Sequence, residues 1–223
     1  MPRPRHGKKT KKLKPTLHIF CEGEKTEPYY LKSYISEYHS STRQLATILV
    51  EKTDKNTPIS LVEEAIAHQS RNGLEIDEYW VVYDREAINK YSHEMHQQAR
   101  QRAIANGIEI AFSNVCFEHW LLLHLEDHRR GYSNCTELLK QSSFKALLAS
   151  KCGIKNYDKG LPILFEKIKH GINDAKIRAE SICNSAVKDA EVGKEAPHYL
   201  NPYTDVHKLL DAMKGFEEKV KKK

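Results

Sequence analysis

Acidic residues follow two apolar segments that have the length and composition of buried strands. Glu22 comes directly after the apolar run 16–21, and Asp84 and Glu86 come after the aromatic and β-branched run 78–83. In an open parallel sheet, ligands gather outside the carboxyl ends of the strands. Three carboxylates at that edge would suit Mg²⁺ or Mn²⁺, which prefer oxygen ligands and assist phosphoryl transfer. The spacing alone leaves two interpretations open: a metal site formed by these acids, or ordinary helix-capping carboxylates.

Charged residues beside these acids have simpler explanations. Glu24 and Glu27 are expected to form a solvated helix start, where negative charge favours the positive end of the helix dipole. Lys25 and Arg85 either neutralise the site or bind a phosphate, and pairing with neighbouring acids is the alternative. For Arg85 we favour local ion pairing.

A sheet must bring the acids together, and the sequence predicts one. Alternation of strands with helices produces βαβ units and a parallel sheet with right-handed crossovers. We predict an α/β fold with a Rossmann-like core of about four parallel strands over residues 16–130. A basic flexible arm (1–15) precedes it, and a helical extension packed on the core (131–223) follows. The predicted strands are 16–21, 45–50, 78–83 and 108–112; the predicted helices are 26–38, 58–67, 89–105, 116–125, 135–149, 161–170, 173–190 and 203–214.

Composition indicates a soluble globular protein. Hydrophobic residues make up 39% and charged residues 30% of the 223 residues. No apolar run approaches the roughly 20 residues that a membrane span needs, and no signal peptide is evident. Five scattered cysteines argue against a disulfide framework and are expected to be buried thiols. We therefore expect a cytoplasmic protein that does not contact membranes.

Positive charge is concentrated at the N-terminus. The first 14 residues hold seven Lys and Arg and no acid, so with a net charge of +6 the remainder is close to neutral, at 6 − 7 = −1. Such an arm could lie along nucleic-acid phosphates, with affinity from counterion release, or it could be a solvated tail. The arm also raises the possibility of a general RNA-binding factor.

Four motifs together resemble one protein family. They are CEGEKTEPYYL after the first strand, the acidic pair Asp84 and Glu86, SNVCFEHWLLLH, and NPYTDVHKLL near the end. In this order they resemble the RloB family, also called AbiLii-like, over nearly the whole chain apart from the basic arm. The resemblance implies a TOPRIM-like fold, the metal-binding core shared by topoisomerases, primases and OLD-type nucleases. The TOPRIM glutamate would fall on Glu22 and the paired acids on Asp84 and Glu86, where Glu86 replaces the usual second aspartate.

The resemblance adds two site candidates, Glu118 and Lys159. Glu118 matches the acid of a helix motif that is commonly SNPxFE, although Val115 replaces the proline. An acid among large apolar residues is costly to bury without partners, so Glu118 either serves the site or pairs with His119 or an arginine. Lys159 belongs to a turn-like segment and could stabilise developing phosphate charge; a solvated turn is the alternative.

The function implied by the resemblance is that of a nuclease-like hydrolase. The expectation is an endonuclease of the TOPRIM type, dependent on Mg²⁺ or Mn²⁺, that acts on DNA or RNA in anti-phage abortive infection. Its partner would be an AAA or ABC-type ATPase on a separate chain, since this sequence has no GxxxxGK[ST] phosphate loop. The alternative is a non-catalytic module that senses a nucleotide or nucleic acid and regulates that ATPase. A homo-oligomer is compatible with both.

Two other segments are interpreted as structural. A zinc site is one interpretation of the cluster Cys116, His119, His124 and His128. However, only His124 and His128 have the spacing of a shared helix face, and no second ligand pair is nearby. Core or capping histidines are therefore expected. Residues 201–204 are interpreted as a capped helix start.

Overall fold

The computed structural model describes residues 14–40, 46–87 and 89–221. Among these residues, no helix has the length and apolar character needed to cross a membrane. The elements in chain order are β1 (Thr16–Cys21), α1 (Thr26–Tyr38), β2 (Thr47–Val50), α2 (Pro58–Asn72), β3 (Glu78–Asp84), α3 (His93–Ala105), β4 (Ile108–Asn114), α4 (Phe117–Leu123), α5 (Cys135–Gln141), α6 (Phe144–Cys152), α7 (Leu164–Ile168), the 3₁₀ turn η2 (Lys169–Gly171), α8 (Ile172–Lys188), the 3₁₀ turn η3 (Pro197–Tyr199), β5 (Tyr203–Thr204) and α9 (Val206–Lys221).

A mixed, mostly parallel sheet forms the centre of the molecule, which confirms the α/β class. Its strand order is β2-β1-β3-β4-β5. The four predicted strands pair in parallel, and Cys21 at the end of β1 lies opposite Val82 of β3. The carboxyl ends of β1 and β3 therefore lie at the same edge, which is the arrangement that brings Glu22 and Asp84 together.

The fifth strand was not predicted. Residues 203–204 pair antiparallel with the end of β4, and the helix predicted to start at 203 begins instead at Val206. The Asp205 carboxylate accepts a hydrogen bond from the Phe112 backbone N–H at 2.6 Å, and the Asp205 N–H donates to the Phe112 carbonyl at 3.0 Å. This pairing joins residues about ninety positions apart, so local sequence carries no sign of it.

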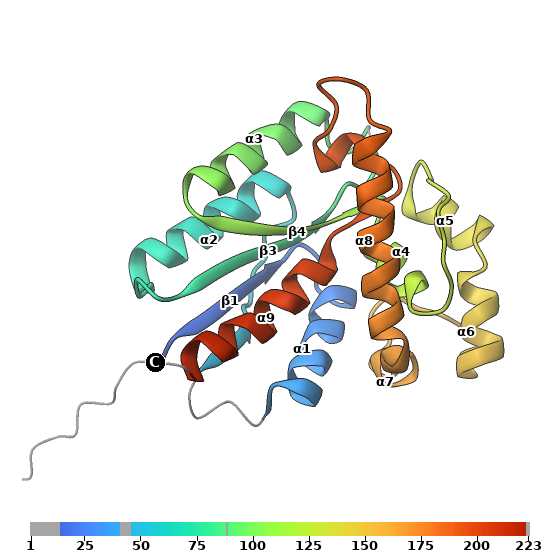
Figure 1. Cartoon of the computed structure of the whole chain (residues 1–223), viewed down its shortest axis with the longest axis horizontal. Coiled ribbons are helices and arrows are strands. Elements are labelled where there is room, and N and C mark those ends of the chain that lie inside the picture. Colours follow the sequence, from blue (N-terminus) through green and yellow to red (C-terminus); the bar gives the residue numbers. More distant parts are fainter. Residues whose placement is uncertain (1–13, 41–45, 88, 222–223) are drawn as a thin grey trace, which may run out of the picture.

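Helices cover both faces of the sheet, with α2 and α3 on one face and α1 and α9 on the other (Figure 1). Strand alternation divides the core between them. In β3, Trp80 and Val82 pack in the α1/α9 cluster, whereas Tyr79 and Val81 pack in the α2/α3 cluster. Both faces of β3 are buried, as expected for a central strand of a parallel sheet.

Most other boundaries agree with the predictions to within a few residues. The strand 16–21 and the helix 26–38 are confirmed. The single helix predicted at 135–149 is wrong, because α5 ends at Gln141 and α6 begins at Phe144, with two serines between them. Of the strand predicted at 45–50, residue 45 lies outside the described residues.

Segments on both sides of residue 130 share one apolar cluster. Trp120 of α4, Phe165 of α7 and Leu209 of α9 all belong to the α1/α9 cluster. The predicted helical extension therefore contributes to the same core as the strands. The domain limits themselves stay a prediction, and residues 1–13 of the predicted arm lie outside the described residues.

Candidate functional site

A cavity of about 370 Å³ lies at the carboxyl ends of β1 and β3. We call it the carboxylate cavity. All five site residues predicted from the sequence line it, although their roles stay predictions. The full lining is Glu22, Gly23, Glu24, Lys25, Thr26, Glu27, Asn56, Asp84, Glu86, Lys90, Tyr91, Glu118 and Lys159.

Glu22 and Asp84 are held by backbone groups of the sheet edge. The Glu22 N–H donates to the Val82 carbonyl at 2.9 Å, and the Asp84 N–H donates to Glu22 Oε2 at 3.3 Å. Asp84 Oδ2 accepts a hydrogen bond from the N–H of Phe117, at the start of α4, at 3.0 Å. Asp84 Oδ1 is buried and has no hydrogen-bond partner among the described residues. Since buried polar atoms are normally paired, this oxygen is suited to a ligand.

Glu118 enters the cavity from the first turn of α4 and is 1% exposed. Its Oε1 accepts a hydrogen bond from the Tyr157 hydroxyl at 3.1 Å and lies 3.6 Å from Lys159 Nζ. Its Oε2 accepts from the Cys135 thiol at 3.3 Å. The partners considered from the sequence, His119 or an arginine, are not those that the structure shows. Glu118 instead fixes Lys159, which comes from a distant turn.

Glu27 is a site-lining residue that the sequence analysis assigned wrongly. It was expected to be solvated, but only 7% of it is exposed, and it lies in the first turn of α1 facing the cavity. Gly23 makes this possible, because a Cβ atom at that position would lie 2.1 Å from Glu27 Oε2. The glycine directly after Glu22 was the available signal of a close approach. Glu24 is exposed, as expected.

Glu86 and Arg85 follow Asp84 in the chain, but their side chains have different surroundings from that of Asp84. Glu86 has a positive φ of 55°, and its Oε1 pairs with Lys90 Nζ at 3.1 Å, with the side chain 30% exposed. It therefore lies at the rim of the cavity. Arg85 is buried and donates to the carbonyls of Tyr91 (2.6 Å) and His198 (3.2 Å), so the favoured local ion pairing is wrong.

Burial perturbs the ionisation of the acids. Desolvation raises the pKa of Glu22 to about 7 and that of Glu27 to about 7. Desolvation, together with the charges of Glu27, Glu118 and Glu22, raises the pKa of Asp84 well above its usual value. Burial alone would lower the pKa of Lys159, but the combined negative charges around it, with Glu118 the strongest, outweigh burial and raise the pKa. Without a cation, the cavity therefore retains protons near neutral pH.

The donor set fits a hydrated hard cation. Asp84 offers an unpaired oxygen, and burial raises the pKa values of the neighbouring Glu22 and Glu27 to about 7. Within the part of the chain that the structure describes, two groups of three potential ligands have donor atoms all within 4.8 Å, His18/Glu51/His68 and Cys116/Glu118/Cys135. Both differ from the set Glu22, Asp84 and Glu86. Mg²⁺ commonly binds through one or two carboxylates and keeps several waters, so wider spacing suits it.

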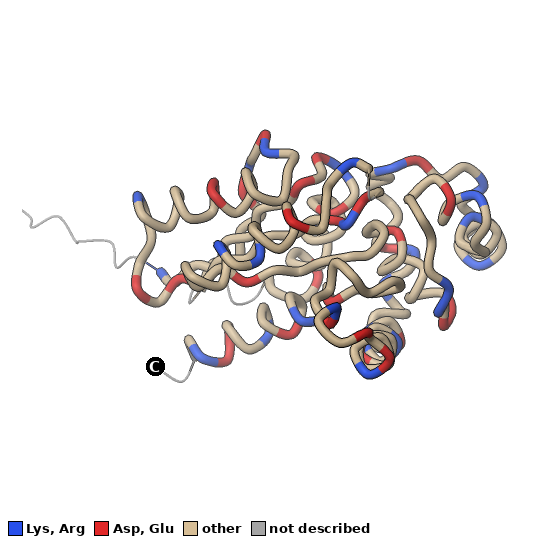
Figure 2. The backbone as a smooth tube through the Cα atoms, turned by 90° about the horizontal axis from the view of Figure 1, so that it is seen from above, with Lys and Arg blue, Asp and Glu red and all other residues tan. Residues whose placement is uncertain are grey.

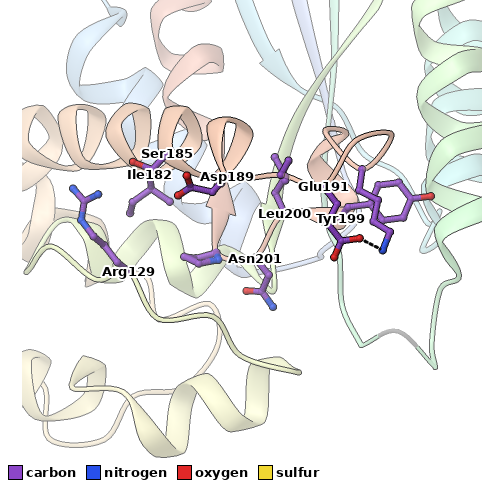
Figure 3. Close-up of a pocket in the computed structure, with 12 residues that line it drawn as sticks. Arg129, Ile182, Ser185, Asp189, Glu191, Tyr199, Leu200 and Asn201 are labelled. Carbon is purple, nitrogen blue, oxygen red and sulfur yellow. Dashed lines mark hydrogen bonds and ion pairs between the residues drawn. The ribbon is translucent and has the colours of Figure 1, made fainter.

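A second cavity, of about 420 Å³, lies beside the C-terminal end of α8 (Figure 3). We call it the α8 cavity. Three of the four charged side chains that line it have partners: Arg129 Nε lies 3.1 Å from Asp127, and Lys194 Nζ lies 2.6 Å from Glu191. It therefore offers a ligand less uncompensated charge than the carboxylate cavity does.

Comparison with known proteins gives one match. A family model described as RloB-like protein matches residues 17–213, a span that contains every residue of the carboxylate cavity. No curated protein and no solved structure matches the chain.

Proposed function

The chain belongs to the RloB-like family, and we propose that it is a metal-dependent, nuclease-like effector of anti-phage defence with a TOPRIM-like core. The observation that carries this proposal is Asp84, a buried carboxylate at the end of β3 with one unpaired oxygen, surrounded by other acids. A parallel sheet with Glu22 after β1 and Asp84 after the adjacent strand β3 supports the TOPRIM-like assignment.

Asp84 and Glu22 would hold Mg²⁺ or Mn²⁺. Bound there, the cation would polarise a phosphodiester and favour ionisation of an attacking water. Glu86 is the third ligand implied by the family resemblance, and it would have to leave its ion pair with Lys90 to reach the cation. Glu27 interacts more strongly with Asp84: after burial, its negative charge has the largest effect on the pKa of Asp84, which it raises.

The other residues have roles that follow from their contacts. If Asp84 holds the cation without Glu22, then Glu22, whose pKa burial raises to about 7, can take up a proton from an attacking water near neutral pH. Lys159 keeps its charge beside Glu118 and can neutralise a phosphate oxygen as negative charge develops. Glu118 acts through Lys159 and is a positioning residue.

The adjacent surface suits a nucleic-acid substrate. A cavity of about 790 Å³, here called the aromatic cavity, shares Glu86 with the carboxylate cavity. Its lining includes Tyr132, His93 and Tyr199, and the last two rings stack with centroids 4.3 Å apart. Nucleobases stack on such rings. A single-stranded DNA or RNA segment is therefore the substrate class we propose.

Charge along the described chain is mixed. Figure 2 shows basic and acidic residues interspersed along it. The strongest concentration of positive charge in the sequence is in the first 14 residues. We propose that this segment supplies phosphate affinity, which deletion of residues 1–14 would reduce together with the salt dependence of binding.

A cleavage assay tests the proposal. Purified chain, alone and with any ATPase that co-purifies with it, is incubated with single-stranded DNA, single-stranded RNA and plasmid DNA in Mg²⁺ or Mn²⁺. We expect cation-dependent cleavage that is lost in Glu22→Gln and in Asp84→Asn. Cleavage that persists in both variants, or that never depends on a divalent cation, contradicts the proposal.

A non-catalytic sensing module is the competing function, and the aromatic cavity favours it equally because stacking serves binding as well as cleavage. A phage-plating assay with Asp84→Ala separates the two. A sensor that retains its fold and its aromatic cavity keeps protection, whereas a nuclease loses it. Circular dichroism of the variant establishes that it folds.

A further inference from the structure

A histidine and carboxylate cluster lies on the α2 face of the sheet, away from the carboxylate cavity. His18 belongs to β1, Glu51 directly follows β2, and His68 lies in α2. One donor atom from each residue lies within 4.8 Å of the donor atoms of the other two. Along β1, His18 is four residues from Glu22, a separation of roughly 13 Å in a strand. The cluster is therefore separate from the candidate nuclease site.

His18 has a carboxylate near each of its ring nitrogens. Its Nδ1 lies 2.6 Å from Glu51 Oε1, and its Nε2 lies 3.8 Å from Asp77 Oδ2. Asp77 is itself fixed, since its two oxygens accept hydrogen bonds from the N–H groups of Thr16 and Leu74, each at 2.8 Å. A carboxylate behind a histidine orients the ring and strengthens it as a ligand.

His68 is not explained by the pair of His18 and Glu51. Its Nδ1 is buried and has no hydrogen-bond partner among the described residues. Its ring is held by aromatic neighbours, with centroids 4.6 Å from His18, 5.6 Å from Phe20 and 5.9 Å from Tyr79. The packing therefore places a histidine with an unpaired nitrogen beside a second histidine and a carboxylate.

We propose that His18, Glu51 and His68 bind one Zn²⁺, with Asp77 orienting His18. Two imidazoles and one carboxylate form a common zinc donor set and suit Zn²⁺ better than Mg²⁺. Bonds of about 2.0–2.2 Å place tetrahedral ligand atoms roughly 3.3 Å apart, so side-chain adjustments close the site. The cation replaces the proton between His18 and Glu51, and the partly exposed Glu51 side chain leaves a path from solvent.

The bound ion would join three elements of the fold. It would fasten the end of the edge strand β2 to β1 and to α2. The segment that leaves Glu51 reaches the carboxylate cavity five residues later at Asn56, whose carbonyl accepts a hydrogen bond from the Tyr91 hydroxyl. The zinc site is therefore a structural site that anchors one wall of the carboxylate cavity.

Metal titration of the full chain tests this inference without any activity assay. Chelator-treated protein in millimolar Mg²⁺ is titrated with Zn²⁺ by calorimetry, and the melting temperature is measured with and without Zn²⁺. We expect one Zn²⁺ per chain at this site, with a rise in melting temperature of about 5–10 °C at a hundredfold excess over Kd. His68→Ala and Glu51→Gln should each weaken binding at least about 100-fold and abolish the rise, whereas Asp77→Asn should weaken binding about 10–100-fold.

Two controls isolate the site. His170→Ala, which changes an exposed histidine, should bind Zn²⁺ as the wild type does. The Cys135→Ser background removes binding by Cys116 and Cys135, and Co²⁺ bound to the remaining site should show no thiolate charge-transfer band. Unchanged Zn²⁺ affinity in both His68→Ala and Glu51→Gln overturns the proposal. Loss of all Zn²⁺ binding in Cys135→Ser also overturns it. If His68→Ala fails to fold, Glu51→Gln at a partly exposed position carries the test.

Discussion

The carboxylate cavity and the α8 cavity have similar volumes, about 370 and about 420 Å³, but opposite charge arrangements. In the α8 cavity, Arg129 and Lys194 pair with adjacent acids at exposed positions. In the carboxylate cavity, Asp84 and Glu27 are buried beside further acids, and Asp84 keeps an unpaired oxygen. Exposed pairs contribute little to stability, whereas buried charges without partners are costly.

This difference indicates where a ligand would be bound. A fold retains buried acids without partners when a ligand supplies the compensating charge. Substituting such active-site residues often makes the protein more stable at the cost of its activity. Cavity volume does not distinguish the carboxylate cavity from the α8 cavity. The raised pKa values of Glu22, Glu27 and Asp84 do separate them, because they reflect acids that are buried beside one another.

The largest expected effect is that of Asp84→Asn. The amide oxygen can still accept the hydrogen bond from Phe117, so the fold is retained. Cation-dependent cleavage should fall by roughly 10²–10³-fold or more. Metal-free protein should become more stable in urea unfolding at pH 7, because burial and the neighbouring acids raise the pKa of Asp84 and so disfavour its charged form. Asp189→Asn in the α8 cavity is the matched control, with neither change. Reduced stability in Asp84→Asn would contradict the comparison.

Glu27→Gln tests the residue that the sequence analysis missed. If Glu27 shares the cation, its loss should weaken Mg²⁺ or Mn²⁺ binding by about 10–100-fold, measured by calorimetry. If Glu27 only repels Asp84, its removal lowers the pKa of Asp84 and strengthens binding instead. We expect the weaker binding. Glu24→Gln, at the exposed neighbouring acid, should leave affinity within about twofold.

The comparison also shows what the sequence could and could not provide. Glu22 and Asp84 were predictable, because apolar runs ended at them and parallel strands align their ends. Glu27 was not predicted because helix-start acids are usually solvated, and its burial depends on Gly23 and on a cavity shared with distant residues such as Asp84 and Glu118. Likewise, β5 arises from pairing between residues 113–114 and 203–204, which local patterns do not record. Local periodicity predicted most helices and strands, whereas long-range contacts determined the burial of Glu27 and the pairing of β5.

Metal binding should depend on pH across neutrality. Glu22 and Glu27 have pKa values of about 7 in the folded protein, so a cation must displace protons below that pH. For one such group, the ionised fraction rises about tenfold from pH 6 to pH 8, and Mg²⁺ or Mn²⁺ affinity should rise with it. The stability of the metal-free protein should change in the opposite direction. The unfolded chain loses its protons near pH 4 to 5 and the folded chain near 7, so stability falls as pH rises through that window. Affinity that is flat from pH 6 to pH 8 would contradict the raised pKa values.

Among the metal ligands implied by the family resemblance, the smallest effect is expected for Glu86→Gln. The family resemblance places Glu86 among the metal ligands, but the structure pairs it with Lys90 at the rim, with 30% of its side chain exposed. Because the cation would compete with Lys90 for this carboxylate, its loss should reduce cation-dependent cleavage by less than about tenfold. Lys90→Met, which frees Glu86, should leave cleavage unchanged or raise it. A loss of cleavage in Glu86→Gln as large as that in Asp84→Asn would show that Glu86 leaves Lys90 and binds the cation. Glu86 would then belong with the buried acids of the site.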